Sequence, residues 1–321
     1  MHLVIGAGEF LGRHVSRSLA AEVPLIELNA DADDETLSDA IAGVEVVVFA
    51  AQTAVPAHRI RFRRTEPRSL ARVVDAARRS RVRRIVHVST GDVFGSDHFA
   101  RVTEKSKIKP HHAFEKQKLF EEEWLFANAG DVEVVVIRPG RVFGAGEDWM
   151  LPRLMAAAVR GRVWLPGGGR AKQTFVSGED VGRACLAASD RGRPGHRYLV
   201  GGFDSTWRDC LFSAARAVGF AAEIASVPYD LAYARALAAE TVTPQGAVVW
   251  PGIFAIDVMG KPHQYDDSYS RRELTWSPSV GSFEQEMPAM APWLSALPEV
   301  AAALRESSTA PTQEATSPPG R

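Results

Sequence analysis

Short apolar runs alternate with segments of helical periodicity between residues 2 and 200. The apolar runs are nearly continuous, which is typical of strands buried on both faces of a parallel sheet. The alternation predicts an α/β fold with a Rossmann-like, doubly wound parallel sheet covered by helices on both faces. The expected strands are residues 2–5, 25–28, 44–50, 84–88, 132–137 and 198–200, and the expected helices are residues 13–20, 34–42, 69–79, 114–128 and 179–188.

The pattern loosens after residue 140. A helix is predicted over residues 149–160, a turn over 167–169 and a short strand over 174–176, and helices and loops dominate beyond residue 206. Open α/β sheets bind ligands at the carboxyl edge of their strands, where a second lobe would complete a cleft. The sequence thus predicts a Rossmann-like domain at residues 1–205 and a smaller C-terminal substrate lobe at 206–305, to which residues 146–172 also contribute. Residues 306–321 are polar and proline-rich, and we expect them to form a disordered tail.

Composition excludes several classes of function. The 321 residues carry a formal net charge of -1, so nothing favours binding to nucleic acid or to an anionic membrane. No apolar run reaches the roughly 18 residues of a membrane span, and a strand beginning at residue 2 leaves no room for a signal peptide. Cys185 and Cys210 lack metal-type spacing, so we predict no metal site and a reducing, cytoplasmic location.

A glycine-rich loop joins the first expected strand to the first helix. Gly6, Gly8 and Gly12 allow a tight turn and close approach of the backbone to a pyrophosphate, which the amides at the helix start, near Phe10 and Leu11, would hold. The spacing is G-x-G-x-x-x-G rather than G-x-G-x-x-G, and Glu9 would repel a phosphate unless it turns to solvent or meets Arg13. A tight turn without a cofactor is the alternative.

The position of the ribose-binding acid is ambiguous. Asp31 has suitable spacing, about twenty residues beyond the glycine loop. The segment 29–37 is also similar to a later strand-to-helix junction, which would mean that a strand–helix unit is shortened here. Arg13 could meet a 2′-phosphate or be a surface arginine, so the choice between NAD and NADP stays open.

Four ordered motifs carry a resemblance to a known family. Residues 88–95 read V-S-T-G-D-V-F-G, similar to V-S-[ST]-x-x-V-Y-G, and Phe114-x-x-x-Lys118 matches Y-x-x-x-K except for the tyrosine. Residues 137–144 resemble L-R-P-x-x-V-Y-G, and residues 174–181 resemble F-V-x-V-x-D-V. Over about residues 1–295 the chain therefore resembles the extended short-chain dehydrogenases/reductases, the NAD-dependent epimerase/dehydratase group.

The resemblance implies NADPH or NADH as cofactor and a role for each matching residue. Thr90 would contact the substrate carbonyl or alcohol, and Lys118 would bind the nicotinamide ribose. Asp92 lies where the dehydratases of the family carry an acidic pair, which Gly91 breaks here. The family often dimerises through two helices, here those near Ser69 and Phe114. Gly6, Gly8, Leu11 and Gly12 would line the pyrophosphate, and Pro139 to Val142 would pass near the nicotinamide.

Phe114 stands where the family has the tyrosine that transfers the reaction proton, and a phenyl ring has no proton to give. Three explanations remain: His111, His112 or Asp92 supplies the proton, the substrate polarises its own carbonyl, or no redox chemistry occurs. Four aromatic residues lie in segments that border the family's substrate site. Core packing is the default for each, but together they would suit a flat apolar ligand; they are Phe94, Phe143, Trp149 and Trp207.

We therefore expect an atypical NAD(P)H-dependent ketoreductase that acts on a bulky, aromatic, polyketide-like small molecule. The alternatives are a sugar-nucleotide epimerase or dehydratase, and a catalytically silent nucleotide-binding or scaffold protein. The first alternative oxidises an unactivated alcohol, which needs the missing phenolate as base.

Overall fold

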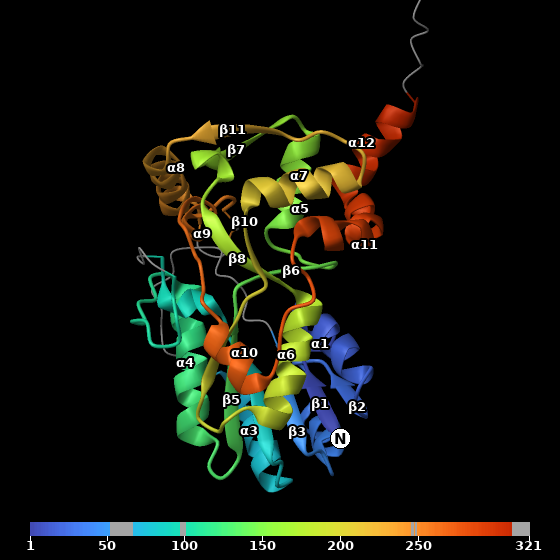
Figure 1. Ribbon diagram of the computed structural model, residues 1–321, viewed down its shortest axis with the longest axis vertical. Coiled ribbons are helices and arrows are strands. Elements are labelled where there is room, and N and C mark those ends of the chain that lie inside the picture. The colour runs from blue at the N-terminus through green and yellow to red at the C-terminus, as the bar shows by residue number, and fades with distance from the viewer. Residues whose placement is uncertain (52–66, 97–100, 245–246, 248, 310–321) are drawn as a thin grey trace, which may run out of the picture.

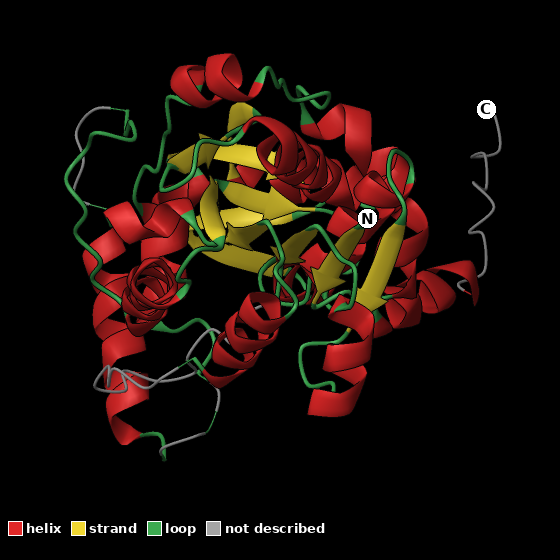
Figure 2. Ribbon diagram, turned by 90° about the horizontal axis from the view of Figure 1, so that it is seen from below, coloured by secondary structure: helices red, strands yellow, loops and turns green. Residues whose placement is uncertain are grey.

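The computed structural model describes residues 1–51, 67–96, 101–244, 247 and 249–309. Its central sheet has six parallel strands in the order β2-β1-β3-β4-β5-β9. Helices cover both faces (Figures 1 and 2), which confirms the doubly wound α/β fold. The strands are β1 His2–Ile5, β2 Leu25–Leu28, β3 Val46–Phe49, β4 Arg84–Val88, β5 Glu133–Pro139 and β9 Arg197–Val200.

Two apolar clusters lie between the sheet and its helices. Helices α1, Phe10–Ala20, and α6, Gly178–Arg191, pack on one face, where Val4, Val86 and Ile137 are buried. The other face is covered by α2, Asp34–Ile41, α3, Arg68–Arg79, and α4, Ala113–Asn128. Because alternate side chains of a strand point to opposite faces, the continuous valine and isoleucine runs bury both faces of the sheet.

The direction of the strand order reverses between β1 and β3. Strand β1 pairs with both β2 and β3, and β2 is the edge strand in the described part of the chain. The sheet is therefore one strand shorter than the 3-2-1-4-5-6 order on this side, as the shortened unit at 29–37 predicts. Open sheets bind ligands outside such a reversal, so the crevice begins between the loops after Ile5 and Phe49.

A second lobe lies over the carboxyl edge of the central sheet (Figure 1). One shared apolar cluster joins its helices and strands, with Met155, Leu211 and Phe283 fully or almost fully buried. Its helices are α5 Leu151–Val159, α7 Trp207–Ala217, α8 Tyr229–Val242, α9 Ile253–Gly260, α11 Phe283–Ala296 and α12 Pro298–Thr309, and its strands are β6 Arg141–Phe143, β7 Arg162–Pro166, β8 Lys172–Ser177, β10 Phe203–Thr206 and β11 Glu223–Val227.

Two further segments are placed at the ends of this lobe. Helix α10, Ser268–Leu274, returns to the central sheet and buries Leu274 against the α6 side. Helix α12 continues to Thr309, so it extends into the segment that the sequence predicts as a tail, whereas residues 310–321 lie outside the described residues. None of the helices within the described ranges is long and apolar enough to cross a membrane.

Candidate functional site

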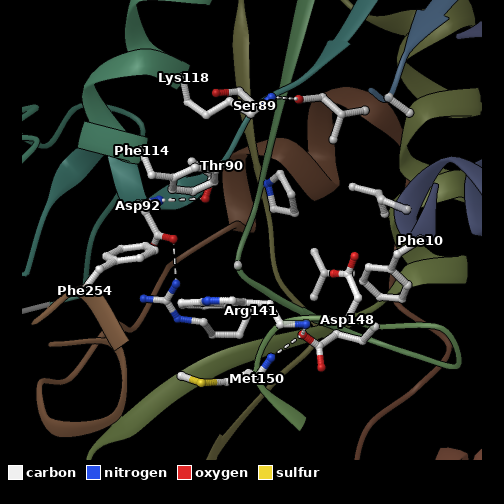
Figure 3. A pocket seen from close by; sticks show the side chains of 18 of the residues that line it. Phe10, Ser89, Thr90, Asp92, Phe114, Lys118, Arg141, Asp148, Met150 and Phe254 are labelled. Atoms are coloured by element: carbon white, nitrogen blue, oxygen red, sulfur yellow. Dashed lines mark hydrogen bonds and ion pairs between the residues drawn. The ribbon is translucent and has the colours of Figure 1, made fainter. Parts of the chain in front are cut away.

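A cavity of about 390 Å³ opens at the carboxyl edge of the central sheet (Figure 3). Its volume lies within the range typical of small-molecule sites. Residues of the glycine loop, of the β3, β4 and β5 ends, of α4 and of the second lobe meet here. They are Phe10, Leu11, Ala50, Ala51, Val88, Ser89, Thr90, Asp92, Phe114, Lys118, Pro139, Gly140, Arg141, Val142, Glu147, Asp148, Trp149, Met150, Arg153, Trp207 and Phe254.

The glycine loop is packed so tightly that side chains would not fit. Gly6 has a φ of +90°, and a Cβ there would lie 2.6 Å from the Cα of Ala51. A Cβ on Gly12 would lie 1.8 Å from the carbonyl oxygen of Gly6. The loop therefore turns sharply into α1, whose first residues, Phe10 and Leu11, line the cavity. Amides at a helix start have no partner within the helix and can hold phosphate oxygens.

The outer part of this loop is tied to β2 and to residue 146. The amide of Gly8 donates to the side-chain oxygen of Asn29 at 3.1 Å, directly after β2. The Arg13 guanidinium donates to the carbonyl oxygens of Gly8 and of Gly146. Asp31 is exposed two residues further on. At the end of β2, where an acid would bind a ribose, the structure places an amide side chain instead.

Thr90, Asp92 and Arg141 form a connected group in the cavity wall. The amide of Asp92 donates to the hydroxyl oxygen of Thr90 at 3.2 Å, and Nη1 of Arg141 donates to Oδ2 of Asp92 at 2.6 Å. Burial alone would raise the pKa of Asp92, but the charge of Arg141, followed by His263, holds that pKa below its usual value. Asp92 is therefore an ionised carboxylate at neutral pH.

Lys118 lines the cavity although its side chain is only 5% exposed. Its Nζ lies 3.1 Å from Oε2 of Glu121 and 3.4 Å from the carbonyl oxygen of Val88, so the ammonium group is fixed. Beneath it, His87 is fully buried on β4. Burial and the nearby Lys118 lower the pKa of His87 to about 4, so its ring is neutral.

Phe114 faces the cavity from the first turn of α4, and Figure 3 shows its ring next to Thr90 and Asp92. Its centroid lies 5.6 Å from that of Phe254 in the second lobe. His112 is not among the residues that line the cavity in the described part of the chain. Its Nε2 lies 2.8 Å from Oδ2 of Asp257, and its ring packs against Phe254 at 5.0 Å.

The second lobe supplies an aromatic wall. Trp149 and Phe254 stack with centroids 5.2 Å apart and planes inclined by 22°. Trp149 and Trp207 line the cavity, as the sequence predicts for two of the four aromatic residues it singles out. Phe94 and Phe143 are instead buried in the core, at 0% and 3% exposure, and do not line the cavity, so for them the default of core packing holds. Phe143, the last residue of β6, packs against the rings of Phe203 and Phe283, and Phe94 packs with Leu199 of β9.

Several cavity residues carry no sequence signal of their own. Phe254 and Arg153 come from helices whose approach depends on long-range packing. Glu147 accepts hydrogen bonds from the amides of Trp149, Met150 and Leu151 at 2.6–2.7 Å and thereby caps α5. Burial raises the pKa of Glu147 despite these three bonds. Arg141 lies inside the motif at 137–144 and could have been found there, because arginine differs in charge from the apolar residues around it.

A nicotinamide dinucleotide fits these residues. The tight turn at Gly6 and Gly12 leaves the start of α1 open toward the cavity, and Lys118, Pro139 and Val142 line the same space. Three groups of side chains that the sequence assigns to the pyrophosphate, the ribose and the ring thus meet in one cavity. Gly6, Gly8, Gly12, Arg13 and Asp31 are not among the residues that line the cavity.

A family model and a curated relative match this chain. The model of the NAD dependent epimerase/dehydratase family matches residues 2–201. The 4-hydroxy-2-methyl-3-oxo-4-farnesyl-3,4-dihydroquinoline-1-oxide ketoreductase of Stigmatella aurantiaca is 29% identical over 257 residues, which are 77% of this chain and 76% of the relative.

Two solved structures illustrate the fold. The UDP-glucuronic acid 4-epimerase from Bacillus cereus, in complex with UDP-glucuronic acid and NAD, has a TM-score of 0.71 at 17% identity, over 92% of this chain and 99% of that chain. RMD from Pseudomonas aeruginosa, complexed with NADPH, has a TM-score of 0.68 at 18% identity, over 91% of this chain and 98% of that chain. At these identities the likeness establishes the architecture.

Proposed function

The chain belongs to the NAD dependent epimerase/dehydratase family, and we propose that it is an atypical NAD(P)H-dependent ketoreductase that reduces a bulky aromatic carbonyl compound. One observation carries the proposal. Thr90, Lys118 and Phe114 line one cavity that also has an aromatic wall, and Phe114 stands where the family has its acid/base. Such a site can orient a carbonyl and a cofactor, and it lacks the phenolate that removes a proton from an alcohol.

A bound reduced nicotinamide would supply the hydride. Gly6, Gly8, Leu11 and Gly12 would hold the pyrophosphate, and Lys118 would hydrogen-bond the adjoining ribose. Pro139 and Val142 would lie along the ring. The residues near the end of β2 do not decide between NADH and NADPH. Asn29 and Asp31 would suit the ribose diol of NADH, whereas Arg13 would suit the 2′-phosphate of NADPH.

The aromatic wall supports a flat substrate. Rings of Phe10, Phe114, Trp149 and Phe254 border the cavity, and a planar aromatic ligand can stack on such surfaces. The relative from Stigmatella aurantiaca acts, according to its name, on a dihydroquinoline, which is also a fused aromatic system with a keto group. We infer that this chain takes a substrate of the same kind, polyketide-like or otherwise polycyclic.

Asp92 and His112 are both held by other side chains and are poorly suited to replace the phenol as proton source. Asp92 pairs with Arg141 and is ionised, so it is better suited to orient Thr90 than to protonate a substrate. His112 is engaged by Asp257 behind the ring of Phe254. We therefore propose that water gives the proton, and that Thr90 hydrogen-bonds the carbonyl oxygen beforehand.

The sugar-nucleotide chemistry of many family members is less compatible with this site. Dehydratases of the family need an acidic pair, and Gly91 stands at one of its two positions. A Cβ on Gly91 would lie 2.7 Å from Cζ of Tyr265, so the ring of Tyr265 fills the space that an acidic side chain would require. Together with Phe114, this leaves neither the base nor the acid pair of that reaction.

The proposal is tested by adding NADH or NADPH to the protein, first by calorimetry and then by 340 nm absorbance with a panel of aromatic ketones such as anthraquinones and fluorenone. We expect binding of at least one nucleotide and ketone-dependent loss of absorbance. Lys118→Met should weaken nucleotide binding without changing the circular dichroism spectrum. Absence of binding by both nucleotides would overturn the proposal, and binding without any turnover would support the silent alternative.

The oligomeric state and the location of the protein are also part of this proposal. We propose a homodimer through α3 and α4, which are neighbours on one face of the sheet, and a monomer in light scattering would refute it. Both cysteines are free and buried, and we propose a reducing, cytoplasmic location.

A further inference from the structure

Three cationic side chains line the cavity in the described part of the chain, and two of them have carboxylate partners. Nζ of Lys118 lies 3.1 Å from Oε2 of Glu121, and Nη1 of Arg141 lies 2.6 Å from Oδ2 of Asp92. The third is Arg153, in the first turn of α5, which forms no ion pair within the described residues. The cavity wall therefore contains one cation without an ionic partner.

The guanidinium of Arg153 is held at the edge of the aromatic wall. Its Nη1 donates to the carbonyl oxygens of Asp148, at 2.9 Å, and of Trp149. Its Cζ lies 5.2 Å from the ring centroid of Trp250, which in turn lies 6.3 Å from that of Trp149. Carbonyl oxygens and an aromatic face orient a cation, but they carry no net charge that would neutralise it.

Two nitrogens of this guanidinium are open to a ligand. Nε and Nη2 of Arg153 have no hydrogen-bond partner among the described residues, and they are not among the buried atoms that lack one. Both atoms are therefore accessible in a half-buried side chain that lines the cavity. Nε and Nη2 form one edge of the guanidinium, where two parallel N–H groups match the two oxygens of a carboxylate.

This cation lies away from the expected reaction centre. Figure 3 shows Asp148, whose carbonyl oxygen accepts from Arg153, at the end of the cavity opposite Lys118. The nicotinamide ribose is proposed to bind at Lys118, so a carbonyl reduced there belongs to the near part of the substrate. The far edge of a flat substrate would then lie toward Arg153.

We propose that the substrate is a flat aromatic ketone with a carboxylate on its far edge, and that Nε and Nη2 of Arg153 bind this carboxylate while the rings stack on Trp149 and Phe254. The inference rests on the proposed ketoreductase function and names the substrate class within it. A ring system on this wall fixes the plane of the substrate, and the ion pair fixes its direction in that plane. Arg153 is thus a specificity-determining residue and takes no part in the transfer of hydride or proton.

Two acidic residues of the cavity lining bear on the same charge. Glu147 accepts from the amides of residues 149–151 and is directed at the start of α5. Asp148 is exposed and forms no ion pair within the described residues. Because its side chain is acidic and belongs to the residue whose carbonyl holds Arg153, it opposes the binding of an anion there. Removal of this charge should strengthen the binding of the anionic substrate.

The test compares two ligands that differ in charge. Anthraquinone-2-carboxylate and anthraquinone-2-carboxamide have the same rings and nearly the same shape. In calorimetry without nucleotide, we expect the unmodified protein to bind the carboxylate about 10-fold more tightly, as for one charge-assisted pair of hydrogen bonds. Arg153→Met should remove this preference and Arg153→Lys should keep part of it, whereas Asp148→Asn should increase it. High salt should reduce the preference of the unmodified protein.

Arg160→Met is the matched control. Arg160 follows the last residue of α5, pairs with Glu299 at 3.0 Å and is not among the residues that line the cavity. The control should keep the preference for the carboxylate, and circular dichroism checks that each variant is folded. Equal affinity for the two ligands in the unmodified protein, or a preference that survives Arg153→Met, overturns the inference.

Rates separate this inference from the proposed function. With the nucleotide that binds, the unmodified protein should reduce the carboxylate with a lower KM than the carboxamide, and Arg153→Met should raise that KM about 10-fold with little change in kcat. Reduction of both ketones with equal KM overturns the inference alone. A preference for the carboxylate in binding, without reduction of either ketone, overturns the proposed function alone. Tighter binding of UDP-glucose than of the carboxylate overturns both.

Discussion

At the scale of single residues, position 114 decides whether the cavity holds a side-chain acid/base for the reaction proton. The Phe114 ring already faces the cavity beside Thr90, so Phe114→Tyr adds a hydroxyl at the place where the family transfers its proton. We expect kcat/KM to rise about 10²-fold in both directions, because the new phenol donates the proton in reduction and its phenolate accepts the proton in oxidation. Absorbance at 340 nm measures both directions.

The comparison of the two directions carries its own control. If Phe114→Tyr raised neither direction, the new hydroxyl would not reach the reacting oxygen, and position 114 would not be the place of the acid/base in this cavity. Phe254→Tyr is a matched variant, because its ring also lines the cavity and contacts that of Phe114. The same hydroxyl placed there should not produce the gain in oxidation.

Gly91 is a second residue that separates this site from that of a dehydratase. We expect Gly91→Asp to destabilise the protein, because its Cβ would lie 2.7 Å from Tyr265, whereas Gly91→Asp combined with Tyr265→Ala should be less destabilised than the sum of the single changes. Urea unfolding of the four proteins gives this coupling. Strict additivity would show that Tyr265 does not occupy the space in question.

At the scale of secondary-structure elements, a buried carboxylate joins four of them under the cavity. Glu122 of α4 is fully buried and accepts from Arg138 on β5, at 3.0 and 2.6 Å, and from Arg197 on β9 at 2.9 Å. It also accepts from the hydroxyl of Ser89, after β4, at 2.5 Å. Glu122 therefore fixes the distance between α4 and the strand ends that carry Thr90.

Glu122→Ala should lower the free energy of unfolding by about 3–5 kcal/mol, because it leaves buried arginine charge without its partner. Chemical denaturation at pH 7 measures the change. Glu123→Ala, one residue further along the same helix and exposed, is the matched control and should cost well under this amount. A loss below about 1 kcal/mol in Glu122→Ala would show that the cluster contributes little to stability.

The elements differ in how far the sequence predicts them. Strands β1, β2 and β4 have the predicted bounds. The residues of β1 and β4 are buried throughout, whereas those of the edge strand β2 are half-buried or exposed, so its short run with three apolar residues was sufficient to predict it. Strands β6, β7, β10 and β11 are not predicted. Strand β10 pairs with β8 and β11 with β7, and these partners are distant in sequence, so the local pattern contains no trace of the pairing.

The residues in and around the cavity also differ in how far the sequence predicts them. Glycines 6, 8 and 12, Thr90 and Lys118 belong to motifs whose spacing is fixed by one strand–loop–helix unit, and the sequence is sufficient to single them out. Phe254 reaches the cavity only because α9 packs against the lobe core, and the pairing of His112 with Asp257 joins residues far apart in the chain. Such contacts depend on tertiary packing rather than on local periodicity.

At the scale of the whole molecule, buried histidines make stability depend on pH. Burial, followed by a nearby cation, lowers the pKa of both His87 and His263 to about 4 from 6.5. Between these values the unfolded chain binds protons that the folded protein does not, so the free energy of unfolding falls as the pH drops. Glu115 has the opposite effect on stability. Burial and the charge of Asp92 raise its pKa from 4.5 to about 7, so between these values the folded protein binds a proton that the unfolded chain does not, and the free energy of unfolding rises as the pH drops.

The contribution of His87 can be isolated by His87→Leu, since both ring nitrogens of His87 have no hydrogen-bond partner within the described residues. When the unfolded side chain is fully protonated, each proton that the protein takes up on unfolding adds about 1.4 kcal/mol per pH unit to the slope of the unfolding free energy against pH. His87→Leu removes one such proton. Between pH 6 and 5 the unfolding free energy of the unmodified protein should therefore fall more steeply than that of the variant, by up to about this slope. Above pH 8 the slopes of the two proteins should coincide, because neither state binds a proton there. Identical slopes between pH 6 and 5 would mean that His87 is protonated in the folded protein, and Lys118 would then lie beside a second cation under the cavity.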